Sequence, residues 1–433
     1  MYKIIFILIV CLLVSSITSC FHNDDNSNLL NSTPKYSGFV THAKQERDKT
    51  PQVKPPELQQ QISNNNEFAF NLYNYLKNHE NLGNKNIVYS PLSISLSMAM
   101  LSAGAKGETL DQINQSLHFN PNQTVLHPLY NKLSLHYENL NRGKINLFIN
   151  NELWGQQDFS FEQTFLDTLA VNYGTRMNLV DFFAAPEESR VTINNWISEQ
   201  TQQKIKKAIP QGFITGDTRL LMTNTIYFDA DWSDPFDPDM TTNEIFNLVD
   251  GQEIVIPFMG GKKRMLNSYN TPELVAVELE YLDNNLSMVF IMPKEQTIHD
   301  FENRFNQQIF ANILGNFQLS ELVLVLPKFE YNTELPLSSG LKSLGVNNAF
   351  IPSLADFSGI NSSELLYVGG ALQKAYISVD ERGTEAGSAT AIAVNLVSAP
   401  LVINLNRPFF FIVHDKELNN ILFMGRVLDP RSN

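Results

Sequence analysis

Residues 379–391 have a pattern that suits backbone rearrangement rather than side-chain catalysis. They read Val-Asp-Glu-Arg-Gly-Thr-Glu-Ala-Gly-Ser-Ala-Thr-Ala, a charged start followed by small side chains. Gly383 accepts backbone angles that other residues avoid. The small residues at alternate positions from Thr384 to Thr390 share one face if the segment becomes a strand. We therefore expect a segment that can change its structure and slide into a narrow slot.

The motifs of the common catalytic and metal sites are missing from the sequence. It has no His-Glu-x-x-His, Cys-x-x-Cys, Gly-x-Ser-x-Gly or Gly-x-x-x-x-Gly-Lys, and no Gly-x-Gly-x-x-Gly after a predicted strand. A pair of hydrolase carboxylates distant in sequence is not excluded by spacing. We expect no metal site, no cofactor and no enzymatic activity, with an envelope hydrolase as the alternative from another class.

Composition predicts a large folded core and an acidic surface. The chain has 433 residues, of which 43% are hydrophobic and 11% aromatic, and its formal net charge is -14. A strongly negative charge disfavours nucleic acid and anionic membrane surfaces as partners. We expect a protein that is a monomer and touches a membrane only through its N-terminus.

The N-terminal 65 residues are predicted to lie outside the folded domain. Lys3 precedes a short apolar run, so residues 1–19 are interpreted as a secretory signal peptide. The end of this segment, Ile17-Thr18-Ser19-Cys20, resembles the lipobox of bacterial lipoproteins, in which the cysteine carries the lipid; a plain signal peptide is the alternative. Residues 20–65 are polar and aperiodic and predict a disordered tether. The expected location is the bacterial cell envelope, outside the cytoplasm, with the outer membrane or cell surface favoured.

The rest of the chain, residues 66–433, is predicted to form one α+β domain. Apolar spacing and helix-start signals predict helices near residues 66–76, 91–101, 107–118, 128–140, 161–173 and 188–205. Alternating or continuous apolar runs predict strands at residues 220–229, 274–279, 287–292, 321–329, 402–405, 409–414 and 420–427. Helices first and strands later indicate an α+β protein with large sheets.

Several motifs along residues 66–430 resemble those of the serpins, in the order in which that family has them. They are Ile-Val-Tyr-Ser-Pro-Leu-Ser-Ile-Ser at 87–95, Thr-Asn-Thr-Ile-Tyr-Phe at 223–228, Leu-Pro-Lys-Phe at 326–329, Ala-Asp-Phe-Ser-Gly-Ile at 355–360, Asn-Arg-Pro-Phe at 406–409 and Phe-Met-Gly-Arg-Val at 423–427. The resemblance implies the serpin fold, with a large central β-sheet, additional sheets, eight or nine helices and an exposed reactive loop at about residues 381–400.

The resemblance also implies a mechanism, in which the protein inhibits serine proteases as a suicide substrate. A protease attacks the exposed loop and forms an acyl-enzyme. The cleaved loop then inserts as a strand and traps the protease. The hinge of this loop corresponds to Glu381, Arg382, Gly383, Thr384, Ala386, Gly387, Ser388, Ala389 and Thr390. A non-inhibitory serpin that acts as a binding protein is the alternative within the family.

Spacing in related serpins places the attacked bond at Val397-Ser398. The carbonyl lies about fourteen residues after the hinge glycine, and the next residue lies about ten before Pro408. A β-branched aliphatic residue suits a shallow apolar pocket, which favours elastase-like serine proteases. A cut at Leu396 by chymotrypsin-like or subtilisin-like enzymes is the alternative, and a core strand at 391–401 is another interpretation of the same apolar content.

Five further residues match serpin positions that support opening of the sheet. These are Ser90, Ser93, Asn224, Trp232 and Gln373. Helix capping and core packing would explain the first four equally well in a non-inhibitory protein. The family usually has histidine where this chain has Gln373, although glutamine can also donate and accept hydrogen bonds.

Overall fold

The structure is a computed structural model that describes residues 40–41, 43–140, 145–282, 285–371, 373–384 and 401–431. All of them belong to one compact unit, residues 36–433. The predicted signal peptide, the Cys20 lipid site, hinge residues 386–390 and the predicted Val397-Ser398 bond lie outside the described residues. No helix among the described residues is long and apolar enough to cross a membrane.

The described residues contain nine α-helices and the strands of two sheets, as expected for an α+β protein. The helices are α1 (Pro55–Leu76), α2 (Pro91–Ser102), α3 (Gly107–Ser116), α4 (Gln123–Leu140), α5 (Gln163–Tyr173), α6 (Pro186–Gln200), α7 (Ile298–Glu302), α8 (Gln307–Gly315) and α9 (Leu337–Ser343). The fold class predicted from the sequence is confirmed.

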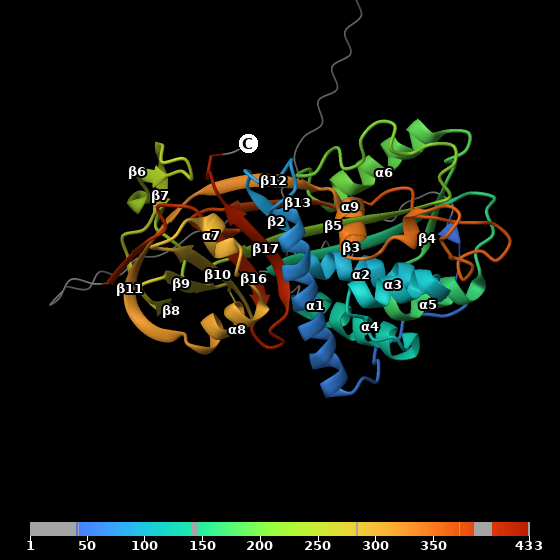
Figure 1. The fold of residues 1–433 in the computed structure, drawn as a ribbon, viewed down its shortest axis with the longest axis horizontal. Coiled ribbons are helices and arrows are strands. Elements are labelled where there is room, and N and C mark those ends of the chain that lie inside the picture. Colours follow the sequence, from blue (N-terminus) through green and yellow to red (C-terminus); the bar gives the residue numbers. More distant parts are fainter. Residues whose placement is uncertain are drawn as a thin grey trace, which may run out of the picture. The chain divides into compact units, whose positions relative to one another are not determined.

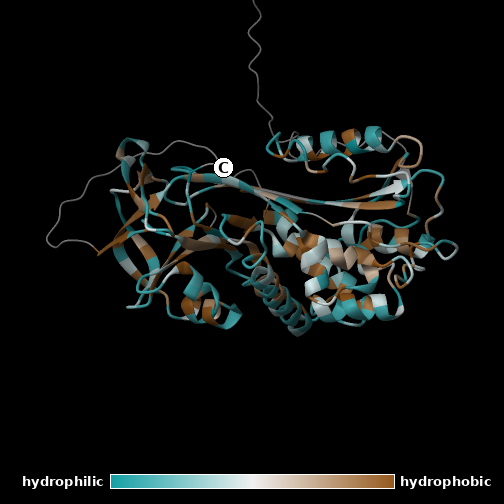
Figure 2. Ribbon diagram, turned by 45° about the horizontal axis from the view of Figure 1, so that its top comes forward, coloured by the Kyte–Doolittle hydropathy of each residue, from teal (hydrophilic) through white to brown (hydrophobic). Residues whose placement is uncertain are grey.

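The first sheet has the strand order β1-β4-β3-β5-β13-β12, with β14 paired to β5. Its strands are β1 (Val40–Thr41), β3 (Ile145–Gln156), β4 (Met177–Val180), β5 (Leu220–Asp231), β12 (Phe329–Leu335), β13 (Gln373–Val379) and β14 (Gly383–Thr384). Helix α6 lies on one face of this sheet and the group α2–α5 on the other (Figure 1). The strands between these helical layers carry both hydrophobic and hydrophilic residues (Figure 2). We call it the central sheet.

The second sheet has the order β2-β17-β16-β10-β9-β8-β11-β7-β6, with β15 paired to β11. Its strands are β2 (Ile87–Tyr89), β6 (Thr242–Asn247), β7 (Glu253–Met259), β8 (Lys263–Asn270), β9 (Leu274–Glu280), β10 (Leu286–Pro293), β11 (Gln318–Pro327), β15 (Leu401–Asn404), β16 (Phe409–Asp415) and β17 (Ile421–Val427). Strands β16 and β17 form the predicted closing hairpin, and every residue of both is buried.

Helix α2 forms as the sequence predicts and passes through the core beneath the central sheet. The Ser90 side chain accepts a hydrogen bond from the Ser93 backbone N–H, and Pro91 occupies the first turn, where its missing N–H costs nothing. All residues of the helix are buried. This helix therefore supplies a fixed polar and apolar floor for β5.

The ordered domain begins earlier than the sequence predicts, because α1 starts at Pro55 and not near residue 66. The two prolines that suggested a tether lie at the start of a helix, which tolerates them. Buried side chains in the first half of α1 are mostly amides: Gln61 and Asn65 are 2% exposed and hydrogen-bonded to each other. Because these buried residues are polar, the apolar spacing that predicts a helix is absent from the first half of α1.

Residues 43–54 also lie against the domain, so they too correct the predicted tether. The Asp48 N–H donates to the Val171 carbonyl at 3.0 Å, and Asn131 Nδ2 donates to the Asp48 carbonyl at 2.7 Å. Upstream, β1 pairs antiparallel with β4. Such contacts join distant parts of the chain and leave no local pattern in a polar segment.

Candidate strand-insertion site

Strands β5 and β13 are neighbours in the central sheet, yet they are paired at a single register position. They run parallel and meet at Lys374↔Thr225. On its other side, β5 pairs with β3 without interruption from Ile145↔Ala230 to Gly155↔Leu220. Among the described residues, the part of β5 that follows Thr225 is therefore paired on its β13 side only at Ala230 and Asp231, by β14.

Strand β14 is the start of the predicted hinge, and it runs antiparallel to β5. Gly383 pairs with Asp231 and Thr384 with Ala230. Before it, a tight turn is held by the Asp380 side chain, whose Oδ1 accepts from the Arg382 N–H at 2.9 Å. The hinge therefore enters the central sheet between β5 and β13, with its direction reversed relative to both.

Gly383 is required here by close approach of two backbones. A Cβ atom at this position would lie 2.1 Å from the Ala230 carbonyl oxygen and 2.7 Å from the Asp231 Cα. Both contacts are with backbone, which cannot move aside without separating the strands. The glycine predicted as the hinge thus permits the pairing itself.

Glu381 anchors the turn that leads into β14. Its carboxylate accepts hydrogen bonds from Lys328 Nζ and Thr241 Oγ1, each at 2.7 Å, and its carbonyl accepts from the Phe236 N–H at 2.7 Å. Burial by itself would raise the pKa of Glu381, but the hydrogen bonds from Lys328 and Thr241 outweigh it and hold the pKa below its usual value. The ionised form therefore fixes the hinge to the residues that immediately precede β12 and β6.

Trp232 directly follows β5, whose last residue is Asp231. Its indole N–H donates to the Asp380 carbonyl at 3.1 Å, and its ring stacks on Tyr281 with centroids 4.6 Å apart. Its backbone N–H also donates to the Arg382 carbonyl at 2.7 Å. This side chain joins the turn before β14 to the aromatic core of the second sheet.

The structure brings Ser90, Asn224 and Gln373 together at the lower end of β13. Gln373 Nε2 donates to Asn224 Oδ1 at 2.8 Å, and its Oε1 accepts from the Ser90 N–H at 3.1 Å. Gln373 is fully buried. One amide therefore ties β13 both to β5 and to the start of α2.

Ser93 contributes differently from what the sequence suggested, and two cluster members were missed. The Ser93 carbonyl accepts from Asn224 Nδ2 at 2.6 Å, while its buried hydroxyl has no hydrogen-bond partner among the described residues. Asn224 Nδ2 also donates to Ser97 Oγ and Asn151 Oδ1, at 2.8 and 2.7 Å. Ser97 could have been found from its helical spacing to Ser93, whereas Asn151 is on β3 and has no local signal.

Glu152, next to this cluster on β3, is a carboxyl group without a cation beside it among the described residues. Its Oε2 accepts from Thr175 Oγ1 at 3.1 Å and from Asn178 Nδ2 at 3.0 Å. Burial raises the pKa of Glu152 to about 7, against the lowering effect of these two hydrogen bonds. The folded protein therefore favours the protonated acid.

We expect Glu152→Gln to stabilise the protein at pH 8. Because the folded pKa lies above the unfolded value, the stability that Glu152 contributes is full below about pH 4.5 and is lost as pH rises through 7. The neutral amide avoids this loss, so Tm should rise by about 2–3 °C at pH 8 and change little at pH 4. Scanning calorimetry at both pH values measures the difference. Glu188→Gln, at an exposed position of α6, is the matched control, and equal shifts for both variants would contradict the expectation.

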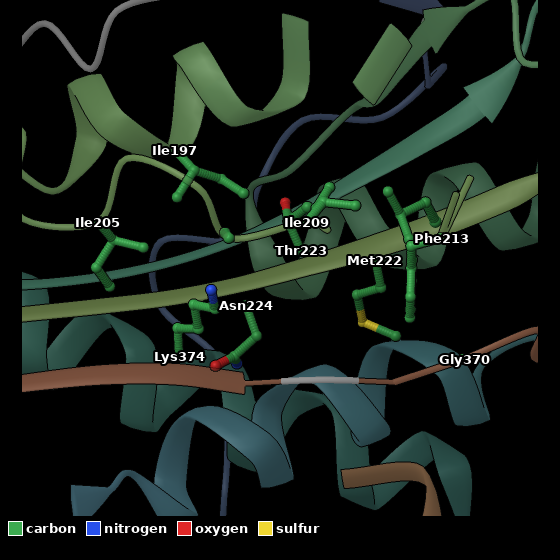
Figure 3. Close-up of a pocket in the computed structure, with 11 residues that line it drawn as sticks. Ile197, Ile205, Ile209, Phe213, Met222, Thr223, Asn224, Gly370 and Lys374 are labelled. Carbon is green, nitrogen blue, oxygen red and sulfur yellow. The ribbon is translucent and has the colours of Figure 1, made fainter. Parts of the chain in front are cut away.

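The pair Lys374↔Thr225, at which β5 meets β13, is covered by α6 and the segment that follows it. Lys374 Nζ donates to the Lys207 carbonyl at 2.6 Å. Ile197, Ile205 and Ile209 lie above β5, while Asn224 and Lys374 lie where β5 meets β13 (Figure 3). A strand that inserts here must separate Gln373 from Asn224 and displace this cover.

Comparison with known proteins agrees with this geometry. Residues 63–430 match the family described as Serpin (serine protease inhibitor). An uncharacterised serpin-like protein of Methanosarcina acetivorans is 35% identical over 84% of this chain and 85% of its own length. The leukocyte elastase inhibitor of Xenopus tropicalis is 32% identical over 84% of this chain and 97% of its own.

A solved structure agrees as well. The thermophilic serpin tengpin in the native state superposes with a TM-score of 0.76 at 27% identity, covering 90% of this chain and 97% of tengpin. The chain therefore belongs to the serpin family, whose members are generally protease inhibitors rather than enzymes.

Proposed function

We propose that the protein is a suicide-substrate inhibitor of elastase-like serine proteases, cleaved at Val397-Ser398. The observation that carries this proposal is the position of β14, which already pairs with the top of β5 while β13 is paired to β5 only at Lys374↔Thr225. After cleavage, the chain that follows Thr384 continues along β5 as a new strand. The leukocyte elastase inhibitor among the relatives supports the target class.

The register of β14 defines where the inserted strand would lie. Gly383↔Asp231 and Thr384↔Ala230 are antiparallel pairs, so each step forward in the loop is a step back along β5. Continuing this register places Ser388 opposite Ile226 and Thr390 opposite Asn224. Directly opposed residues share a face, and the Asn224 side chain points to α2. The small residues at even positions would thus enter the tight face against α2.

Insertion of the loop lowers the free energy of the protein, because it pairs backbone groups and buries side chains. The uncleaved protein is therefore metastable. Strand addition supplies ladder hydrogen bonds along the part of β5 that lacks them. The cost includes the rupture of the hydrogen bond between Gln373 and Asn224. The protein inhibits only if loop insertion is faster than deacylation of the protease.

The proposed function is tested by incubation with an elastase, followed by a denaturing gel and mass measurement of the released C-terminal peptide. A complex that survives denaturation, with a peptide that begins at Ser398, supports both the mechanism and the bond. Complete cleavage without complex contradicts inhibition and favours a non-inhibitory binding protein. A peptide that begins at Val397 instead indicates cleavage after Leu396 and a chymotrypsin-like or subtilisin-like target.

We expect Gln373→Ala to shorten the lifetime of the active inhibitor. The change leaves the Asn224 carbonyl oxygen and the Ser90 N–H without this partner, at a cost of about 1–3 kcal/mol to the closed sheet. Spontaneous insertion should then speed up by roughly tenfold. Residual inhibition after incubation at raised temperature measures this, with Gln373→His as a control that restores a hydrogen-bonding side chain. An unchanged half-life would show that the amide does not hold the sheet closed.

The proposed location is the cell envelope, with the lipid on Cys20. The domain begins within residues 40–55, so the segment between the lipid and the domain is shorter than the predicted tether of residues 20–65. We expect Cys20→Ala to release the protein from membranes, as measured by fractionation of cells that express it. Unchanged fractionation would contradict the anchor and leave the inhibitory function untouched.

A further inference from the structure

A cavity of about 310 Å³ lies below the Lys374↔Thr225 pair that joins β5 to β13. The floor of the cavity is α2, and the lower end of β5, helix α9 and residues 349–371 form its walls. Its lining is mainly apolar and includes Met98, Leu101, Met222, Leu341 and Ala349. A dry cavity of 150 Å³ is large enough for benzene, and small-molecule pockets begin near 300 Å³. This cavity is therefore large enough for a ligand.

Three polar residues of the lining, Ser97, Asn224 and Arg219, differ in what they can offer a ligand. Ser97 and Asn224 are hydrogen-bonded to each other, so they offer a ligand little. Arg219, in the segment just before β5, is part-buried, and its Nη1 donates to the Gly216 and Thr218 carbonyls at 2.8 and 3.2 Å. Within the described chain, no carboxylate forms an ion pair with it. A part-buried guanidinium suits a carboxylate in bidentate geometry.

Asp217 also lines the cavity, but it does not make the cavity prefer a cationic ligand. Asp217 is exposed, so water solvates its charge, whereas Arg219 is partly buried. Phe213 covers this side of the cavity, with its ring packed so closely on Gly370 that a Cβ there would lie 2.6 Å from the ring. The ligand therefore meets an aromatic cover and one guanidinium.

We propose that this cavity binds a medium-chain carboxylate, with its hydrocarbon chain among the side chains of α2 and α9 and its carboxylate at Arg219. Scaling from benzene in 150 Å³ gives a chain of roughly ten to twelve carbons. Such a ligand would also regulate the inhibitor. This second part rests on the proposed function, in which the cleaved loop inserts beside β5. The register of β14 would bring Ile392 and Val394 of the inserted loop opposite Met222 and Leu220, both of which line the cavity. Ligand and inserted strand then compete.

Binding is tested by calorimetric titration of the intact protein with decanoate. One site per chain is expected, together with no detectable binding of butyrate, whose chain is too short. Decanol, which lacks the charge, should bind about tenfold more weakly. Heat that does not saturate at one equivalent, or equal affinities for decanoate and decanol, would overturn the site or its headgroup.

Two variants test where the ligand binds. Ala349→Phe fills the cavity and should abolish decanoate binding, while Arg219→Gln leaves the cavity open and should weaken binding about tenfold. Arg304→Gln, a surface cation paired with Glu273, is the matched control and should leave affinity unchanged. Circular dichroism and Tm establish that each variant folds. If Ala349→Phe does not fold, the comparison of Arg219→Gln with Arg304→Gln decides, and equal affinities overturn the proposal.

Regulation is read from the number of inhibitor molecules cleaved for each protease trapped. Saturating decanoate should raise this number severalfold for the unmodified protein and leave the Ala349→Phe protein unaffected. An unchanged number with decanoate bound would overturn the competition. If no protease forms a complex at all, the proposed function has failed, while the titrations still report on the cavity.

Discussion

Thr384→Arg is expected to turn the inhibitor into a substrate of its target protease. Thr384 is the last described residue of β14 and pairs with Ala230, which is 1% exposed. Directly opposed residues of an antiparallel pair share a face of the sheet, so this register position lies on the buried side. A guanidinium there would have to leave water without a partner, at a cost of several kcal/mol. Insertion would stop at its first step, and deacylation would release active protease.

The measurement is the fraction of inhibitor found as denaturation-resistant complex against the fraction found cleaved. Complex should fall at least tenfold, with a matching gain of cleaved protein. Thr384→Ser keeps a small hydroxyl at the same position and should retain the yield of complex. An unchanged yield for Thr384→Arg would contradict the claim that insertion starts from β14.

The sequence predicted many of the elements that have an apolar inner face, but not all of them: β13 was missed although its Ala375, Ile377 and Val379 are buried. Helix α2 and the β16–β17 hairpin followed from apolar runs that are fully buried. Strand β3 was not predicted, because asparagines at positions 146, 150 and 151 interrupt its alternation. Its order comes from a long pairing with β5, which a local pattern does not encode.

The candidate site shows the same division between local and distant signals. Gly383 and the small residues after it were visible in the sequence, because glycine and small side chains at alternate positions have few other uses. The Lys328–Glu381 ion pair, at 2.7 Å, was missed, since it joins segments 53 residues apart. Motif order identified the family, whereas the contacts that hold the hinge required the fold.

Val397→Arg is expected to move inhibition from elastase-like to trypsin-like proteases. A shallow apolar pocket accepts valine but not a long cationic side chain, whereas a trypsin-like pocket has a carboxylate that pairs with arginine. A pocket built to pair a charge discriminates strongly against residues without it. The association rate with trypsin should rise by a factor of at least 100, and that with elastase should fall by a similar factor.

Leu396→Arg is the control that tests the bond itself, because it moves the same side chain by one residue. If the protease cuts after Val397, only Val397→Arg gains trypsin as a target, and the peptide released from it still begins at Ser398. If Leu396→Arg gains trypsin instead, the cut follows Leu396 and the loop that inserts is one residue shorter. Insertion in the register of β14 has already passed the Gln373–Asn224 contact at Thr390, several residues before either bond. The strand-insertion mechanism therefore survives either outcome, and the two variants decide specificity alone.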